Sequence, residues 1–134
     1  MATATKIAKE IITYIDDVGN IIVTVTRNVP GDMTPAFMDT FAAGTTNVTV
    51  PAIIFTKARV QYFVFTSDQP VTIKTNSATS PQETITLTAG GAYAWNTGHP
   101  EADPLVGDIN GVFVTNAGTA LATVKIYTLL NATP

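Results

Sequence analysis

The stretch VQYFVFTSDQPVTIKTN (Val60–Asn76) reads as a strand, a tight turn and a second strand. In its first half, Tyr62 and Val64 alternate with Phe63 and Phe65, so both faces are apolar and the strand should be covered on both sides. Turn-forming Ser, Asp and Pro occupy the middle, after which apolar and polar residues alternate again. We therefore predict that a central strand and a half-exposed strand form a hairpin around which the fold is built.

Strand signals recur on both sides of this stretch at intervals of roughly ten residues. They are runs of alternating apolar and polar residues at 48–52, Thr84–Ala89, Ala92–Trp95, Gly111–Thr115 and Leu121–Leu130. Pro51 marks the first run as an edge strand, because proline cannot donate to a ladder. The last two runs should form a second hairpin across 116–119, and their residue order echoes that of Val60–Asn76. About eight short strands predict an all-β fold, an antiparallel β-sandwich of the jelly-roll or immunoglobulin-like kind.

The segment 5–28 allows two interpretations. As strands, Ile7, Ile11 and Ile15 lie before a turn at 16–20, and Ile21, Val23 and Val25 return after it. As a helix, the same isoleucines and Val18 fall at spacings of three or four, with Gly19 placed as a C-terminal cap. The β-branched residues favour the hairpin.

The segment 28–46 contains two prolines and two glycines that interrupt its apolar residues. It is predicted to be a loop with buried anchors, with room for one helical turn at Pro35–Phe41. The apolar residues Met33, Phe37, Met38 and Phe41 could plug one end of the sandwich or form an arm that docks on a neighbour. The plug is favoured, because Met and Phe are usually core residues.

Length and composition predict one domain over residues 1–134, with room for an N-terminal arm at 1–10. Hydrophobic residues make up 46% of the chain and charged residues only 13%, so other polar residues must cover the surface. The chain has 24 threonines, which suit half-buried positions in strands. A surface with few charges also suits contacts between subunits.

Charge and targeting signals narrow the classes of partner. The net charge is −3 and the basic residues are scattered, so nucleic acid is not the expected partner. There is no cysteine, no apolar signal segment at the N-terminus and no stretch long enough to span a membrane. We expect synthesis in the cytoplasm, no membrane partner and no cofactor.

No catalytic constellation is visible, and an enzyme is not expected. The chain has one histidine, His99, and three serines, none within G-x-S-x-G. His99, Glu101, Asp103 and Asp108 are metal-ligand types, but their spacing is uninformative and a solvated acidic loop is favoured over a metal site.

Tyr93 and Trp95 share one face of their predicted strand. On a surface they could stack on a sugar ring, whereas inside the sandwich they would form the aromatic centre of the core. The core is favoured, because a domain with a single tryptophan usually buries most of it.

The segments FVFTSDQPVTIKTNSATSPQETITLTAGG (63–91) and GVFVTNAGTALATVKIYTLL (111–130) resemble those of small cysteine-free all-β proteins of tailed bacteriophage heads and tails. The resemblance lies in texture and order, covers about a third of the chain and includes no diagnostic motif. It implies a virion structural protein of the capsid decoration or cement type that binds the major capsid protein or another virion protein. It also implies a homo-oligomer, commonly a trimer. If hydrophobic loop anchors and sheet edges lock neighbouring subunits, the candidate contacts are Met33, Phe37, Met38, Phe41 and the arm before Ile11. The alternative is a carbohydrate- or receptor-binding module of a head or tail fibre that uses Tyr93 and Trp95.

Overall fold

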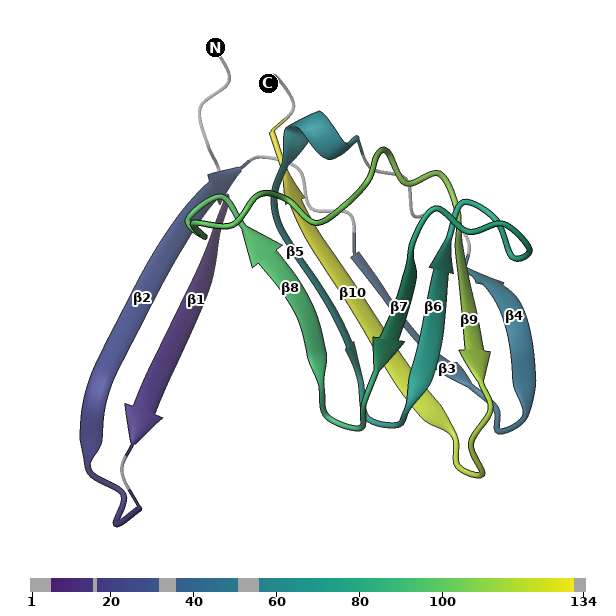
Figure 1. The fold of residues 1–134 in the computed structure, drawn as a ribbon, viewed down its shortest axis with the longest axis horizontal. Coiled ribbons are helices and arrows are strands. Elements are labelled where there is room, and N and C mark those ends of the chain that lie inside the picture. The colour runs from purple at the N-terminus through teal and green to yellow at the C-terminus, as the bar shows by residue number, and fades with distance from the viewer. Residues whose placement is uncertain (1–5, 16, 32–35, 51–55, 132–134) are drawn as a thin grey trace.

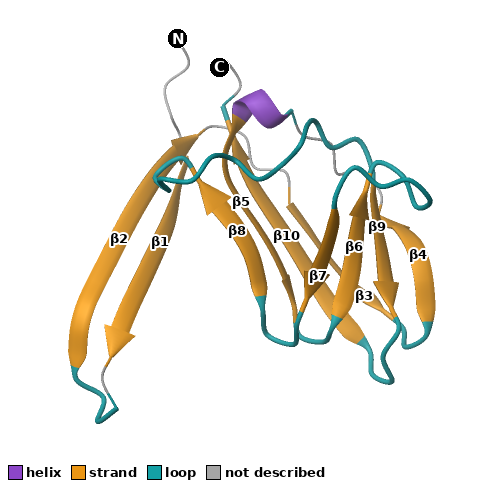
Figure 2. Ribbon diagram, in the orientation of Figure 1, coloured by secondary structure: helices purple, strands orange, loops and turns teal. Residues whose placement is uncertain are grey.

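The computed structural model describes residues 6–15, 17–31, 36–50 and 56–131 (Figure 1). Within these ranges the regular elements are β-strands apart from one turn of 3-10 helix at Lys57–Arg59, as Figure 2 shows, so the all-β prediction is confirmed. Ten strands are present rather than about eight. They are β1 (Lys6–Ile15), β2 (Ile21–Gly31), β3 (Ala36–Phe41), β4 (Thr45–Val50), β5 (Val60–Ser67), β6 (Val71–Thr75), β7 (Thr84–Leu87), β8 (Ala92–Asn96), β9 (Val112–Asn116) and β10 (Ala122–Leu130). No helix in the described ranges has the length and apolar character to cross a bilayer.

Eight of the strands form a jelly roll. One sheet has the order β3-β10-β5-β8, the other β4-β9-β6-β7, and the two pack face to face (Figure 1). The antiparallel pairs β3·β10, β4·β9, β5·β8 and β6·β7 are those of one long hairpin of eight strands. Wrapping that hairpin into two layers adds the pairs β5·β10 and β6·β9. This wrapped arrangement is the jelly-roll topology, so of the two sandwich types expected the chain adopts the jelly roll.

The core lies between the inner faces of the two sheets. Alternate residues of each strand point inward, and Phe63, Phe65, Ile73 and Ile126 are fully buried there. Leu105, from the loop after β8, is also buried in this core. Because side chains alternate along each strand, each sheet has an inner face that forms the core and an outer face that does not.

The prediction that residues 60–67 form a central strand is confirmed, because β5 lies between β10 and β8. The hairpin predicted for Val60–Asn76 is wrong: β5 and β6 belong to different sheets, and the turn between them crosses the sandwich. The hairpin predicted for 111–130 is wrong for the same reason, since β9 and β10 also lie in different sheets. A strand with one apolar face shows the same alternation whether the next strand pairs beside it or packs across the core.

The echo between these two segments has a structural counterpart. The β5–β6 and β9–β10 connections both cross between the sheets, and they lie against each other through the pairs β5·β10 and β6·β9. The two similar segments are thus neighbouring arches of the jelly roll.

The N-terminal segment is a hairpin, as the favoured interpretation expected. β1 and β2 pair antiparallel from Lys6 opposite Gly31 to Ile15 opposite Ile21, which excludes the helix. The loop predicted for 28–46, with its helical turn at Pro35–Phe41, is wrong, because β2 continues to Gly31 and Ala36–Phe41 is an edge strand that pairs with β10. Its ladder partner is more than 80 residues away in the sequence, so the local pattern could not reveal it. The predicted edge strand at 48–52 is confirmed for β4, while Pro51 lies outside the described residues.

Candidate functional site

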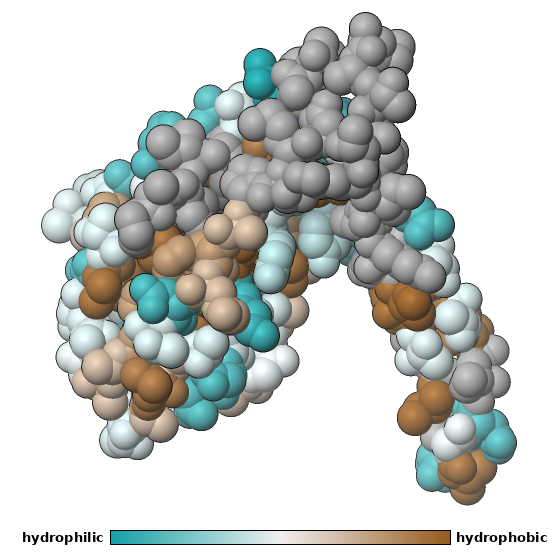
Figure 3. All heavy atoms as spheres, turned by 180° about the vertical axis from the view of Figure 1, so that it is seen from behind, coloured by the Kyte–Doolittle hydropathy of each residue, from teal (hydrophilic) through white to brown (hydrophobic). Residues whose placement is uncertain are grey.

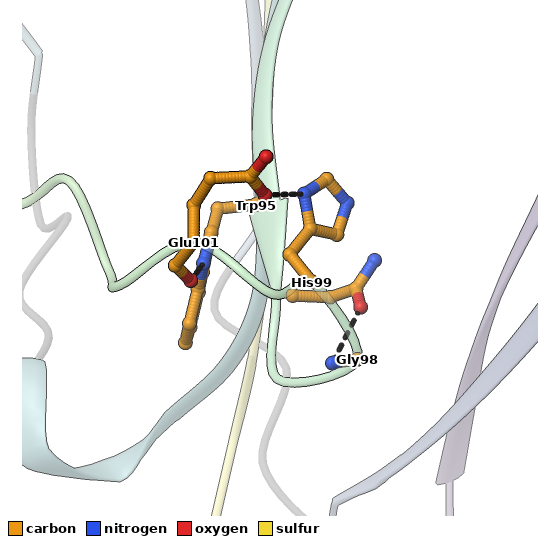
Figure 4. A network of polar contacts seen from close by, with 5 residues as sticks. Trp95, Gly98, His99 and Glu101 are labelled. Atoms are coloured by element: carbon orange, nitrogen blue, oxygen red, sulfur yellow. Dashed lines mark hydrogen bonds and ion pairs between the residues drawn. The ribbon is translucent and has the colours of Figure 1, made fainter.

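The loop after β8 carries the residue types that suggested a metal site. The indole Nε1 of Trp95 donates a hydrogen bond to the carbonyl oxygen of Glu101 at 3.0 Å, and His99 Nδ1 lies 3.6 Å from Glu101 Oε2 (Figure 4). The N–H of Gly98 donates to Asn96 Oδ1 at 2.8 Å, which fixes the turn that leaves β8. Trp95, His99 and Glu101 therefore form one packed cluster at the end of the strand.

Asp103 and Asp108 are used to brace the same loop. Asp103 Oδ1 accepts the N–H of Leu105 at 2.9 Å, and Asp108 Oδ1 accepts the N–H of Lys57 at 2.9 Å. Burial raises the pKa of Asp103, while the Leu105 N–H and the Lys57 charge act in the opposite direction. The structure does not bring these carboxylates together with His99: among the described residues, no three His, Asp or Glu side chains are grouped to hold a metal ion.

A second layer of hydrogen bonds holds the loop against β6. The Glu83 carboxylate accepts the Thr75 hydroxyl hydrogen and, at 2.6 Å, the N–H of Val106. Asn76, which has a left-handed φ of 65°, donates from Nδ2 to the carbonyl oxygen of Asp108 at 2.8 Å and accepts the N–H of Asn110 at 2.7 Å. The rim of this end of the sandwich is therefore fixed by its own polar residues.

Beside this rim lies an open depression of about 590 Å³. It combines an aromatic side chain with amide, hydroxyl, ammonium and carboxylate groups, and it is lined by Lys57, Ala58, Val60, Gln61, Trp95, Thr97, Asp103, Gly107 and Asp108. This combination can stack on and hydrogen-bond to a polar ring such as a sugar.

Tyr93 and Trp95 both lie on the inner face of β8, opposite Phe65 and Phe63 respectively. The ring of Trp95 stacks on Phe63 at a centroid distance of 6.4 Å, and that of Tyr93 stacks on Phe65 at 6.1 Å. Both side chains are half-buried and pack against the core, as the core interpretation expects. Of the two, Trp95 also lines the depression.

The four apolar residues predicted around β3 separate in the structure. Phe41 is buried in the core and Phe37 packs against it, their ring centroids 6.3 Å apart, so both are core residues, but they belong to an edge strand rather than to a loop that plugs the sandwich. Met38 points the other way and is 64% exposed. Met33 lies outside the described residues. Among the described residues of this group, Met38 is therefore the one that a partner could contact.

Two of the serines that a nucleophilic site would need stabilise turns. Ser67 Oγ donates to the carbonyl oxygen of Gln69 at 2.7 Å, and Ser77 Oγ accepts the N–H of Ser80 at 3.0 Å. Their local hydrogen bonds therefore account for these two hydroxyls.

The outer faces of the two sheets differ in chemistry. On the β4-β9-β6-β7 sheet, the cross-strand row Thr115, Thr72 and Thr86 is made of threonine. On the β3-β10-β5-β8 sheet, the corresponding row is apolar and consists of Ala36, Tyr127, Val64 and Ala94. Tyr127 is 49% exposed, and exposed Met38 lies in the next row beside Lys125. The outer face of the β3-β10-β5-β8 sheet, called the apolar face below, is therefore suited to a contact with another apolar surface.

The β1–β2 hairpin is joined to the sandwich at this apolar face. Gly31, the last residue of β2, packs so closely on β10 that a Cβ built on it would lie 2.6 Å from Leu129 Cγ. Leu129 lies two residues after outward-facing Tyr127 and therefore on the same face of β10, so the hairpin begins on the outside of this sheet. From there it extends away from the sandwich (Figure 1, Figure 3).

The hairpin carries apolar residues on the face that it shares with Gly31. By register, Ile12, Val23 and Val25 lie on this face, whereas Ile11 lies on the opposite one together with Thr13, Thr24 and Thr26. Further exposed apolar residues are Ile11, Ile15 and Val18, the last at 77%. From the sequence, only the arm before Ile11 is predicted to make contacts, and residues 1–5 of that arm lie outside the described residues. One feature of the sequence could have indicated that the whole hairpin is exposed: both strands are rich in β-branched residues, and no third strand lies nearby in sequence to cover them.

No protein-family model matches this sequence, and no curated protein shows significant similarity to it. Function is therefore inferred from the jelly roll, the apolar face, the hairpin and the depression beside Trp95.

Proposed function

We propose that this chain is a structural protein of a bacteriophage virion, of the capsid decoration or cement type. It is made in the host cytoplasm, binds the assembled head through the major capsid protein or another virion protein, and acts as a homo-oligomer, with a trimer favoured. The resemblance of 63–91 and 111–130 to phage head and tail proteins supports this proposal. The jelly roll is compatible with it, since the same fold serves in viral capsid domains.

The observation that carries the proposal is the projecting β1–β2 hairpin. A two-stranded hairpin is at best marginally stable in water and needs a third strand or a packed layer to be ordered. Here Ile11, Ile15 and Val23 are exposed on strands of ten and eleven residues. An element of this length with exposed apolar residues is suited to binding another protein.

The proposed mechanism is bridging. The hairpin and the apolar face lie on the same side of the molecule, so one chain can contact two neighbouring subunits of a lattice at once. Linked contacts of this kind resist separation more strongly than either contact alone, because the second contact forms at a high effective concentration. Among the contacts expected from the sequence, Met38 remains a candidate, while buried Phe41 serves the fold.

Co-sedimentation with purified capsids tests the proposal. We expect the wild-type chain to sediment with the particles and the variant Ile12→Asp/Val23→Asp to remain in the supernatant, because two charges on the face shared with Gly31 oppose its burial. The matched control is Thr13→Asp/Thr24→Asp, which places the same charges on neighbouring threonines of the hairpin and should retain measurable binding. A wild-type chain that fails to sediment with any virion particle contradicts the proposal.

A second candidate function is carbohydrate or receptor recognition at a head or tail fibre. The depression beside Trp95 favours it, because this aromatic side chain shares the opening with Gln61, Thr97 and Asp103. Titration with oligosaccharides should then shift the fluorescence of Trp95, the single tryptophan, and Gln61→Ala should weaken the response. Fluorescence that stays constant across a glycan panel argues for the structural role.

A further inference from the structure

The peptide bond between Asn110 and Gly111 joins the loop after β8 to strand β9. It lies between two residues of the core, Ile109 and Val112, whose side chains are fully buried. Asn110 itself is exposed, and within the described ranges no hydrogen bond holds its side-chain amide. An unrestrained side chain therefore stands on a backbone that is anchored on both sides.

An asparagine side chain can be attacked by the backbone nitrogen of the next residue, and this attack is easiest when that residue is glycine. Glycine has no Cβ to shield its nitrogen, and its backbone turns readily. The chain has eight asparagines, and in the sequence Asn110 alone is followed by glycine. Asn76 and Asn116 precede small residues, but hydrogen bonds hold their side-chain amides. Sequence and structure therefore single out Asn110.

We propose that Asn110 deamidates spontaneously in the folded chain. The nitrogen of Gly111 loses its proton to solvent and attacks Asn110 Cγ, the Cγ–Nδ2 bond breaks, and the amide leaves as ammonia, so that a cyclic imide closes. Water then opens this ring. Attack of water at Cγ gives aspartate, whereas attack at the backbone carbonyl carbon gives isoaspartate, in which the chain continues through the side chain. The reaction needs only water and is independent of the proposed function.

Asn76 holds the backbone on both sides of the reacting bond. Its Oδ1 accepts the N–H of Asn110 at 2.7 Å, and its own N–H donates to the carbonyl oxygen of Gly111 at 2.8 Å. These hydrogen bonds restrain the backbone rotation that brings the Gly111 nitrogen to Asn110 Cγ. Deamidation should therefore be slower in the folded chain than in the unfolded chain, and faster once the side chain of Asn76 is removed.

The isoaspartate product cannot keep this arrangement. It adds one backbone atom between the N–H at position 110 and the carbonyl group of Gly111, so the two groups no longer fit the two hydrogen bonds to Asn76. Gly107 and Asp108, which line the depression beside Trp95, come shortly before the modified bond. Deamidation should therefore loosen one wall of this depression as the protein ages.

Peptide mapping by mass spectrometry, after incubation of the purified chain at mildly alkaline pH, tests the proposal. We expect Asn110 to be converted before the other asparagines, and more slowly than in the same chain unfolded in urea. Gly111→Ala should lower the rate strongly in both states, because a methyl group shields the attacking nitrogen. The folded chain has room for this methyl group, since a Cβ there would meet Phe113 at 3.8 Å.

A second variant tests the restraint. Asn76→Gly removes the side-chain hydrogen bonds and suits the left-handed φ of 65° at this position, so it should raise the rate at Asn110 several-fold. The matched control is Asn47→Gly at the other described asparagine with a left-handed φ, 48°, which should leave the rate at Asn110 unchanged. Circular dichroism checks that each variant is folded, and Gly111→Ala decides the assignment of the site if Asn76→Gly is not.

Amide hydrogen exchange measures the consequence. The isoaspartate form can be separated by ion exchange, because a neutral amide has become a carboxylate. Its amides at 105–110 should exchange faster than in the unmodified chain, while those of β5 stay as slow as before. Equal exchange in the two forms would contradict the loosened wall.

Two results overturn the proposed site: Asn110 that stays intact in the folded chain while the unfolded chain is converted, or a rate that Gly111→Ala leaves unchanged. A folded Asn76→Gly variant that reacts no faster than the wild-type chain would show that Asn76 does not restrain the reaction.

Discussion

At the scale of single residues, Asn116 shows how a buried polar side chain fixes a turn. It lies at the end of β9, is fully buried, and donates from Nδ2 to the carbonyl oxygens of Phe41 at 2.9 Å and Ala120 at 2.8 Å. Its Oδ1 accepts the N–H of Gly118 at 3.1 Å. One side chain thereby satisfies three backbone groups and ties the β9–β10 arch to the end of β3.

Replacing Asn116 by alanine should destabilise the fold strongly. The carbonyl group of Phe41 would lose its partner in a buried place, and the two part-buried bonds to the turn would also be lost, which costs about 1–3 kcal/mol in the free energy of unfolding. Urea unfolding followed by circular dichroism measures the change. Thr119→Ala, at an exposed position of the same turn, is the control and should change the value by less than about 0.5 kcal/mol. An Asn116 variant as stable as this control would show that the arch does not depend on these bonds.

At the scale of elements, β10 and the β1–β2 hairpin are expected to differ most in local stability. β10 pairs with β3 on one side and β5 on the other, and its inner face is buried in the core. β1 and β2 pair only with each other in the described part of the chain. Local opening should therefore cost far less for the hairpin than for β10.

Amide hydrogen exchange measures this difference. In the dilute, unassembled chain, the amides of β1 and β2 should exchange much faster than those of β5 and β10. Assembly or capsid binding should slow exchange in β1 and β2 and leave β5 and β10 nearly unchanged, because the hairpin gains a packed layer. Hairpin amides as slow as those of β5 in the monomer would mean that the hairpin needs no partner.

At the scale of the whole molecule, Gly31 is the joint between the hairpin and the jelly roll. A Cβ there would meet Leu129 Cγ at 2.6 Å and the carbonyl oxygen of Leu130 at 2.9 Å. Real Cβ atoms are not found so close to these groups, so any other residue at this position must move the hairpin or β10. The position therefore sets how the two parts of the molecule are arranged.

Gly31→Ala should cost about 1–3 kcal/mol in the free energy of unfolding and should change the small-angle scattering profile, because overpacking forces a shift. The double variant Gly31→Ala/Leu129→Ala removes the crowding leucine atoms and should be more stable than the sum of the single effects predicts. Gly111→Ala is the matched control, because its Cβ would meet only Phe113, at 3.8 Å. Strictly additive effects at Gly31 and Leu129 would show that the two residues do not crowd each other.

The candidate sites were only partly visible in the sequence. Strand parity placed Tyr93 and Trp95 on one face, but it did not say which face is inner, and residues of β5 decide that by stacking on them. The same limit applies to Met38 and Phe41. The sequence places them in one group, but in the strand that pairs with β10 the side chain of Met38 points outward and that of Phe41 points into the core. The apolar face could not be predicted, because its row combines residues from four strands spread over the chain.

By itself, the sequence determined the all-β class, the positions of most strands, the central place of Val60–Ser67 and the threonine-rich surface. These features follow from local alternation and turn residues, which act over a few neighbouring positions. Only the tertiary structure decided that Val60–Asn76 is an arch between two sheets and that the hairpin stands on the outside of one of them. The physical reason is that alternation along a strand fixes only which of its sides is apolar. Which strand becomes its neighbour depends on residues far away in the sequence, and β3 and its partner β10 are more than 80 residues apart.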